Sequence, residues 1–300
     1  MTARPALLLL MGLLTCSPLA SADSSNQFWL MYEQGNAAAT QKEYGKALQL
    51  YKSAIDGAGI FPEAEAAIGD IYLEEGEAAL AQKQYEKAYN LRKSFYIPEK
   101  QYEILYKLAN LFELQQQYKQ MEDTLNRIIA DDRHFQDTAN QRIRTQVEKV
   151  FMERGLDRVL VLYAFDDTFS AAAHSKLGWF YYRTGRFSPA VSQLLYSVIY
   201  RASELKNALL ERDVDYGFTT LQDMLAATEK NADMRSYAAS SGFYRDLYYL
   251  AGSMFANGFP RHALGLWKAL SAVPSAGDYR DLSLRQLKKP FVEPLLTVAR

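Results

Sequence analysis

The residues best suited to acid–base or metal chemistry in this chain are three histidines, His134, His174 and His262. Only the first has acidic neighbours, in the stretch DDRH at 131–134. Apart from this stretch, none has a second histidine or a carboxylate at the spacing that would place two ligands on one helix face. The DDRH stretch is typical of a polar loop between helices. We therefore expect no metal site and no cofactor.

Nucleophilic catalysis has equally few candidates. The sequence contains no G-x-S-x-G, no H-E-x-x-H, no glycine-rich phosphate loop and no EF-hand string. A Ser-His-Asp set assembled in space is not restricted by sequence order, but no residue pattern points to one. We predict that the chain is not an enzyme, and keep a hydrolase with an unrecognised site as the remaining catalytic alternative.

Composition limits the classes of partner. The chain of 300 residues has 34 Lys and Arg against 35 Asp and Glu, which gives a net charge of -1. Binding to nucleic acid normally shows as a basic excess or a basic stripe, so nucleic acid is not the expected partner. A hydrophobic fraction of 49% is ample for a sizeable core. The length allows one large domain, two ordinary domains or an array of repeats.

The first residues are typical of a secretory signal peptide. Arg4 supplies the positive charge, ALLLLMGLL at 6–14 the apolar core, and ASA at 20–22 a small-x-small cleavage site. The apolar run is too short to anchor the chain across a bilayer. We predict a signal peptide at 1–22 and an exported, periplasmic chain that begins at Asp23.

The single cysteine, Cys16, leaves a second possibility open. If cleavage follows Ala22, the exported chain has no cysteine and no disulfide. Alternatively, LLTC at 13–16 acts as a lipobox, and Cys16 is lipidated and retained. The chain would then be anchored at the envelope by lipid alone, and this anchor is the only membrane contact that we expect.

The elements that must position any site are repeated helix pairs. ALQLYKSA at 47–54 has an Ala-x3-Tyr-x2-Ala frame, and AQKQYEKA at 81–88 repeats it 34 residues later. The preceding halves align at Gly35 and Gly69. Small residues recur where two helices would touch and large residues where they would interlock. Such a period built from helix pairs indicates a repeat architecture.

Three more segments keep this spacing. They are LGWFYYRTGRFSPAVSQLL at 177–195, LYYLAGSMFANGFPRHALGLWKAL at 247–270, and the looser LYKLANLFELQQQYKQMEDTLNRI at 105–128. The chain thus resembles the tetratricopeptide repeat (TPR) family. The resemblance implies an all-α fold, a TPR-type α-solenoid in which helix-turn-helix hairpins form a right-handed superhelix.

The repeats predict the domain plan. We expect an N-terminal TPR array of about three repeats at 23–135, followed by a degenerate helical hairpin at 136–169. The stretch RVLVLY at 158–163 is β-prone, but its flanks favour a helix. C-terminal TPR-like repeats follow at 170–275, with a divergent hairpin at about 204–240. A capping helix is expected within 276–300, because the end of a solenoid is otherwise apolar.

The resemblance also implies a site. In TPR proteins the first helix of each hairpin lines a concave groove that holds a peptide or a segment of another protein. Mapped onto this sequence, the groove positions are aromatic with polar punctuation, a composition typical of binding-site cores. Any of the aromatic residues could instead pack between repeats. The predicted groove residues are Trp29, Tyr32, Asn36, Asp70, Tyr106, Asn110, Trp179, Tyr182, Arg183, Arg245 and Tyr248.

One TPR binding mode is not expected. A clamp for a C-terminal carboxylate needs lysines that the first three repeats lack, because Tyr32 and Glu103 stand at those positions. The sequence therefore predicts a non-catalytic scaffold or adaptor that binds a protein or peptide partner in its groove within a bacterial envelope complex. The alternative is a periplasmic carrier of a small ligand or lipid, with an aromatic-lined pocket.

Overall fold

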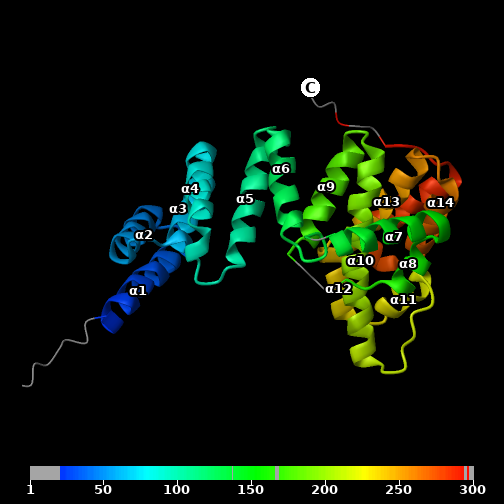
Figure 1. The fold of residues 1–300 in the computed structure, drawn as a ribbon, viewed down its shortest axis with the longest axis horizontal. Helices are drawn as coiled ribbons and strands as arrows, with labels where there is room; N and C mark the ends of the chain where they lie inside the picture. The colour runs from blue at the N-terminus through cyan, green and yellow to red at the C-terminus, as the bar shows by residue number, and fades with distance from the viewer. Residues whose placement is uncertain (1–20, 137, 166–168, 294–295, 297–300) are drawn as a thin grey trace, which may run out of the picture. The chain divides into compact units, whose positions relative to one another are not determined.

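The structure is a computed structural model that describes residues 21–136, 138–165, 169–293 and 296. Cys16 and the predicted signal peptide, except its last two positions, lie outside these residues. All secondary structure in the described residues is helical, as fifteen α-helices and two short 3-10 helices, with no strand (Figure 1). The predicted all-α fold of helical hairpins is confirmed. No described helix is long and apolar enough to cross a membrane.

The chain divides into two compact units, unit 1 at 1–104 and unit 2 at 105–300. The division falls within α5 (Lys100–Leu114), inside the third predicted repeat rather than after it. Unit 1 consists of two antiparallel hairpins, in which α1 packs on α2 and α3 on α4. Its complete helices are α1 (Ser21–Thr40), α2 (Tyr44–Ala58), α3 (Pro62–Glu74), α4 (Ala78–Asn90) and η1 (Arg92–Ser94).

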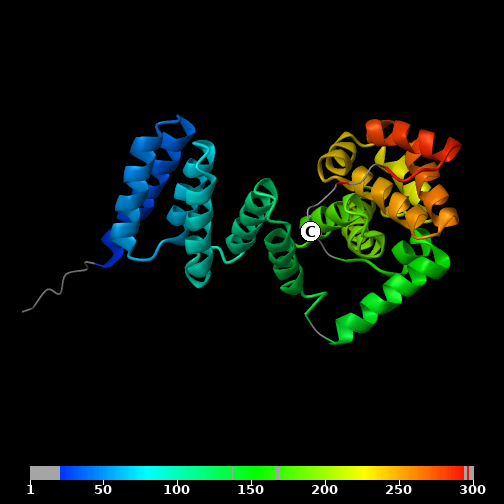
Figure 2. The same ribbon diagram turned by 90° about the horizontal axis from the view of Figure 1, so that it is seen from above.

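Unit 2 contains the remaining helices. Its hairpins pair α9 with α10 and α13 with α14, and α15 packs on α14 (Figures 1 and 2). Its elements are α6 (Tyr118–Ala130), α7 (Thr138–Arg154), α8 (Leu156–Leu162), α9 (Ala171–Arg183), α10 (Phe187–Arg212), α11 (Leu221–Thr228), α12 (Ala232–Ser240), α13 (Phe243–Ala256), α14 (Pro260–Ser271), η2 (Pro274–Ala276) and α15 (Asp278–Lys288).

The same turn closes five of the hairpins. In each, one residue after the first helix has a positive φ, and the next N–H donates to the carbonyl five residues earlier. This is the Schellman arrangement, which satisfies carbonyls at the end of a helix. The residues with positive φ are Lys42, Gly76, Gln116, Gly185 and Gly258. The turn therefore recurs even where a lysine or a glutamine replaces glycine.

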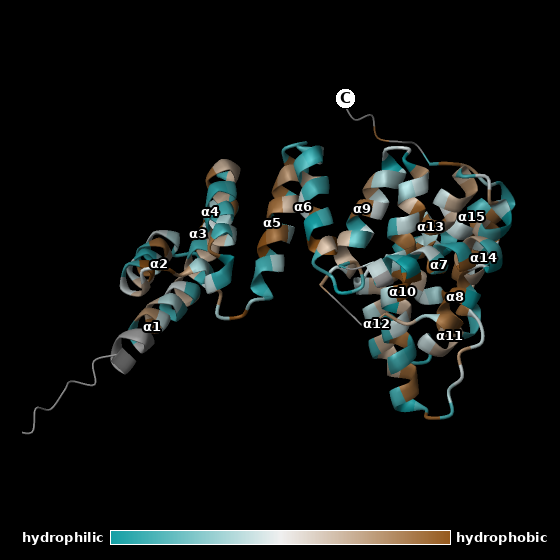
Figure 3. Cartoon of the chain, viewed as in Figure 1, coloured by the Kyte–Doolittle hydropathy of each residue, from teal (hydrophilic) through white to brown (hydrophobic). Residues whose placement is uncertain are grey.

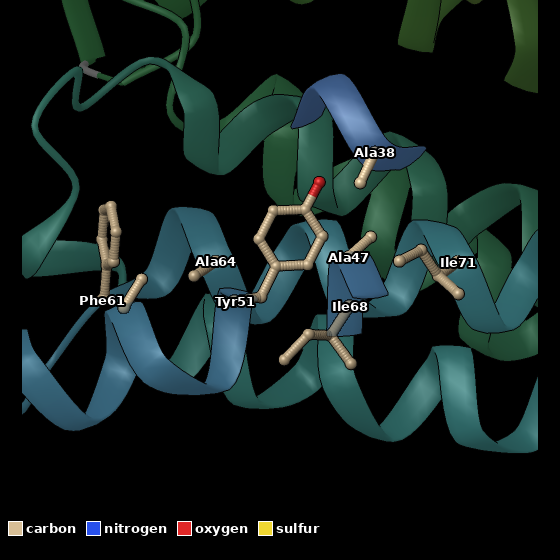
Figure 4. Packing of buried hydrophobic residues seen from close by; sticks show 8 residues of the cluster. Ala38, Ala47, Tyr51, Phe61, Ala64, Ile68 and Ile71 are labelled. Carbon is tan, nitrogen blue, oxygen red and sulfur yellow. The ribbon is translucent and has the colours of Figure 1, made fainter. Parts of the chain in front are cut away.

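The hairpins of unit 1 share one packing device. The buried ring of Tyr51 lies so close to Gly35 that a Cβ there would be 2.6 Å from it. Gly69 and Tyr85 repeat this arrangement with the same 2.6 Å approach. Figure 4 shows the Tyr51 ring among the small side chains of the unit 1 core. The Gly and Tyr of the repeat are therefore one contact, in which the missing side chain admits the ring.

The structure differs from the predicted hairpin at about 204–240. The helix α10 runs for 26 residues to Arg212, so the first part of that segment continues α10. Leu205 and Leu209 are buried on this extension, and no glycine or proline interrupts it. The rest forms the two short helices α11 and α12.

The segments predicted as a hairpin at 136–169 and as a cap within 276–300 both contain helices. The β-prone stretch at 158–163 lies largely in α8, which buries Val159 and Leu160 and is mostly brown in Figure 3. In the predicted cap, α15 ends at Lys288, two residues before Pro290, which restricts the residue before it to extended backbone.

Candidate protein-binding face

Four tyrosines from three helices of unit 2 form one cluster. Tyr182 on α9 packs against Tyr249 on α13, with ring centroids 4.9 Å apart. Tyr248, also on α13, lies 5.2 Å from Tyr249 and 5.8 Å from Tyr279 on α15. Gly252 makes room for this packing, since a Cβ there would lie 2.9 Å from the Tyr182 ring. We call the surface formed by α9, α13 and α15 around these tyrosines the tyrosine face.

The chain itself covers this face. After α15, the described residues 289–293 and Leu296, which we call the return segment, run back toward α13 and α9, as the red trace of Figure 1 shows. Glu293 donates its backbone N–H to the Tyr182 hydroxyl at 3.2 Å and accepts from the Tyr248 hydroxyl at 2.7 Å. Leu296 donates its N–H to the Arg183 carbonyl at 2.6 Å. An extended polypeptide therefore occupies the face.

A buried glutamine holds the start of the return segment. The Gln286 side chain on α15 accepts from the Phe291 N–H at 2.8 Å and donates to the Phe291 carbonyl at 3.1 Å. Its amide also donates to the Tyr248 hydroxyl at 3.1 Å. This paired contact resembles one step of a β-ladder, in which one residue exchanges both of its backbone bonds. Gln286 thus recognises main chain and no particular side chain.

The tyrosine hydroxyls stay protonated at neutral pH. Burial raises the pKa of Tyr182 to about 12, and the nearby Glu293 carboxylate raises it further while the bond from the Glu293 N–H lowers it. Burial likewise raises the pKa of Tyr249 to about 12. Burial and the Glu293 carboxylate also raise the pKa of Tyr248. The face therefore presents neutral hydroxyl groups that can both donate and accept hydrogen bonds.

Two side chains of the return segment are only partly covered by the protein. Phe291 is 42% exposed and Val292 37% exposed, whereas Tyr182 and Tyr248 beneath are each 1% exposed. The contacts of the return segment are thus backbone groups and one carboxylate, without a buried apolar anchor among residues 291–293.

Trp179 and Arg183 border the face at the end of α9. The Arg183 guanidinium lies 5.2 Å from the centre of a Trp179 ring, a cation–π contact. Its Nε is buried and has no hydrogen-bond partner among the described residues. The Arg183 carbonyl is the acceptor for Leu296.

The structure brings four of the predicted groove residues together. Trp179, Tyr182, Arg183 and Tyr248 all lie on or beside the tyrosine face. Arg245 does not join them. It donates from Nε to Asp246 at 3.1 Å and also bonds Ser175, so its side chain belongs to a polar network in the core of unit 2.

The predicted polar residues of unit 1 bond within their own hairpins. Asn36 accepts from the Tyr51 hydroxyl at 2.8 Å, and Asp70 accepts from the Tyr85 hydroxyl at 2.7 Å. The sequence predicted both residues in the groove. Each instead fixes the tyrosine that fills the gap between the two helices of its hairpin.

The predicted aromatic residues of unit 1 form a cluster. Trp29 and Tyr32 are half-buried and pack against Phe61, with ring centroids 4.8 and 5.1 Å apart. Trp29 also contacts Tyr96, which is 79% exposed, at 5.7 Å. The packing role that the sequence left open for Trp29 and Tyr32 is therefore present in the structure.

The two predicted residues on α5 are both engaged within unit 2. The Tyr106 hydroxyl donates to the Phe169 carbonyl at 2.5 Å. Asn110 accepts from the Lys176 ammonium at 2.9 Å. These contacts hold α5 against the start of α9, and neither residue lies with the tyrosine face.

Sequence reasoning did not find Tyr249, Tyr279, Gln286 and Glu293. The TPR groove positions lie on one face of each first helix. Tyr249 directly follows Tyr248, so it is not at one of these positions. The other three belong to the cap and to the segment after it, which the repeat pattern does not cover. The one signal in the sequence was Gln286, a polar residue that α15 buries and that therefore needs hydrogen-bond partners.

Two of the three histidines pack inside unit 2. His174 is fully buried and bonds Gln193 through Nδ1 at 2.7 Å, and burial lowers its pKa to about 4. Burial lowers the pKa of His134, which stacks on Phe165 at 4.7 Å. Among the described residues, no group of three or more His, Cys, Asp or Glu side chains could hold a metal ion.

Comparison with known proteins adds little to this description. No family model matches the sequence. An uncharacterized protein of Treponema pallidum (strain Nichols) is 22% identical over 241 residues, which are 80% of this chain and 63% of that protein. The match thus spans less than two thirds of that relative's length.

One solved structure is among the matches of this chain. It is the complex of the TPR2AB domain of yeast Sti1 with pHSP90, at 13% identity and a TM-score of 0.33, over 89% of this chain and 97% of that chain. The helices, turns and Gly–Tyr contacts described above themselves define the class, an all-α protein of TPR-like hairpins.

Proposed function

We propose that this protein is a non-catalytic TPR-like scaffold that binds an extended segment of a protein partner on the tyrosine face. The observation that carries the proposal is the return segment, because it shows that this face holds a polypeptide by its backbone. Main-chain bonds give affinity in this mode of recognition, and selected side-chain contacts give specificity. The TPR resemblance independently implies that first helices such as α9 and α13 carry the binding surface.

The proposed setting is a complex in a bacterial envelope. It is supported by the signal-like sequence at 1–22, and Cys16 offers a lipid anchor as the alternative to cleavage. In either form the chain would be exported and would meet envelope proteins. Purification of the native chain and a mass measurement of its N-terminal peptide distinguish removal of Cys16 from lipidation.

The binding proposal is tested by cross-linking in the bacterium that encodes the chain, with mass spectrometry of the recovered proteins. Trp179→Ala removes an indole beside the face, and Phe259→Ala removes an exposed ring just before α14. Circular dichroism checks that both variants are folded. We expect Trp179→Ala to reduce cross-linking of a partner at least several-fold and Phe259→Ala to leave it unchanged. Equal recovery by both folded variants would refute the assignment of the face.

A second candidate function is supported by a cavity. An open cavity of about 410 Å³ lies among α7, α8, α11 and α14, and its lining includes Phe151, Arg154, His262 and Leu266. Its size is within the range of pockets for small molecules. In this alternative the protein would be a carrier that holds a small ligand or lipid in the cavity. Native mass spectrometry of the chain from its own host would show a bound small molecule if the carrier function holds, and a bare chain mass if it does not.

A further inference from the structure

The contacts of the return segment divide into two kinds. Backbone groups of Phe291, Glu293 and Leu296 bond the face, and any residue except proline can supply them. One side chain, the Glu293 carboxylate, accepts from the Tyr248 hydroxyl at 2.7 Å. The Phe291 and Val292 side chains are 42% and 37% exposed, so neither is a buried anchor. Selection among extended segments must therefore come chiefly from the carboxylate.

The groups under the return segment need a polypeptide over them. Tyr182, Tyr248 and Gln286 are each 1% exposed, and their hydroxyl or amide groups bond the return segment or one another. A buried donor or acceptor that loses its partner costs about 1–3 kcal/mol. The face is thus built to be covered by a chain with backbone donors at fixed spacing, and not to be left bare.

The carboxylate is bonded by neutral groups. Tyr248 donates to it as a protonated phenol, and no ion pair of Glu293 with a lysine or an arginine occurs among the described residues. A hydrogen bond to a charged group is stronger than one between neutral groups. An acidic residue at this position is therefore preferred over its amide, although both have an oxygen that can accept.

We infer that the tyrosine face binds an extended partner segment that carries an acidic side chain at the place of Glu293, and that the return segment is the resident ligand that such a segment displaces. The inference rests on the proposed function and adds the chemical class of its ligand. Phe291 and Val292 beside Glu293 remain partly exposed, and the acidic side chain is the one side chain of the segment with a hydrogen bond to the face among the described residues. The return segment lowers the apparent affinity for a partner, because the competent face is only fractionally free.

The experiment uses a fluorescein-labelled peptide of residues 290–300, PFVEPLLTVAR, and fluorescence anisotropy. The peptide is titrated with the full chain and with a chain that ends at Lys289, after circular dichroism has shown that the shortened chain is folded. We expect the shortened chain to bind the peptide at least tenfold more tightly than the full chain does. A peptide with Glu293→Gln should bind about five- to tenfold more weakly, and the matched Val292→Ala peptide within about twofold of the original.

Two further measurements test the Tyr248–glutamate bond and the competition by the return segment. Tyr248→Phe in the shortened chain should weaken the original peptide, and it should make the Glu293→Gln peptide bind about as well as the original, because the two changes remove the same bond. Glu293→Gln in the full chain should strengthen binding of the added peptide several-fold, since it weakens the resident ligand. This variant keeps the test decisive if the shortened chain does not fold.

The outcomes separate this inference from the proposed function. Equal binding of the glutamate and glutamine peptides would overturn the acidic ligand class. If partner cross-linking still depended on Trp179, the proposed function would stand without the acidic ligand class. A folded shortened chain that binds none of the peptides, together with a full-length Glu293→Gln chain that gains no affinity, would overturn the resident-ligand assignment.

Discussion

Replacing Gly69 with alanine should destabilise unit 1, although alanine is the better helix former. A Cβ at this position would lie 2.6 Å from Cε1 and 2.8 Å from Cδ1 of Tyr85. Both distances are far below van der Waals contact, so the ring or the helix must move by most of an ångström. The Tyr85 ring is fully buried and its hydroxyl bonds Asp70 at 2.7 Å, so it has little freedom to yield.

The magnitude follows from three contributions. Overpacking of a tight core costs about 1–3 kcal/mol. Loss of the hydrogen bond from Tyr85 to the Asp70 carboxylate costs about 1.5–3 kcal/mol if the ring is displaced fully. The higher helix propensity of alanine returns about 1 kcal/mol. Together they give an expected loss of about 1.5–5 kcal/mol in the free energy of unfolding of unit 1, with the lower end for a ring that is only partly displaced.

The assay is urea unfolding followed by circular dichroism, with Gly45→Ala as the matched control. Gly45 is an exposed residue of α2 in the same unit, and a Cβ there meets nothing within 4 Å. The control should be neutral or stabilising by up to about 1 kcal/mol. If Gly69→Ala stabilises the protein as much as Gly45→Ala does, the Gly–Tyr contact is not the constraint that we derive. Gly35→Ala, opposite Tyr51, should repeat the loss.

Two further predictions concern the core of unit 2. The pKa of His174 falls from 6.5 to about 4 on burial, so the unfolded chain binds this proton first and stability drops as the pH falls from about 6.5 toward 4, by about 3 kcal/mol. Unfolding curves at pH 7 and pH 5 should show this slope, and His174→Gln should flatten it. Asp246→Asn should cost about 3–5 kcal/mol in thermal or urea unfolding, because it leaves the buried Arg201 guanidinium without its carboxylate at 3.1 Å, and an unchanged midpoint would contradict this.

The hairpins were predictable because their determinants are local. The frame at 47–54 and 81–88 records the contact of one helix with its partner 16 residues away, as Gly35 meets Tyr51 and Gly69 meets Tyr85. The helix pairs that keep this frame follow from that spacing. The turns were only partly predictable, since Lys42 and Gln116 take the positive φ that the sequence assigns to glycine.

The return segment could not be predicted from repeats. Its position depends on contacts between residues far apart in the sequence, such as Tyr182 with Glu293, and no periodic pattern encodes such a pair. The same limitation applies to α10, whose extension to Arg212 depends on burial of Leu205 and Leu209 within unit 2. In both cases tertiary contacts decide between conformations that local propensity leaves open.

The repeat frame also accounts for the difference between the polar sites of the two units. In unit 1 the residue after each packing glycine is Asn36 or Asp70, and the tyrosine of the second helix bonds it. In unit 2 the corresponding glycine, Gly178, packs on Leu194, with a Cβ-to-Cγ distance of 2.6 Å, and leucine has no hydroxyl to satisfy. The residue after Gly178, Trp179, therefore does not have to accept a hydrogen bond from a tyrosine hydroxyl. Loss of the internal Tyr–Asn or Tyr–Asp bond thus permits an aromatic residue at the border of the tyrosine face, where a partner segment can meet it.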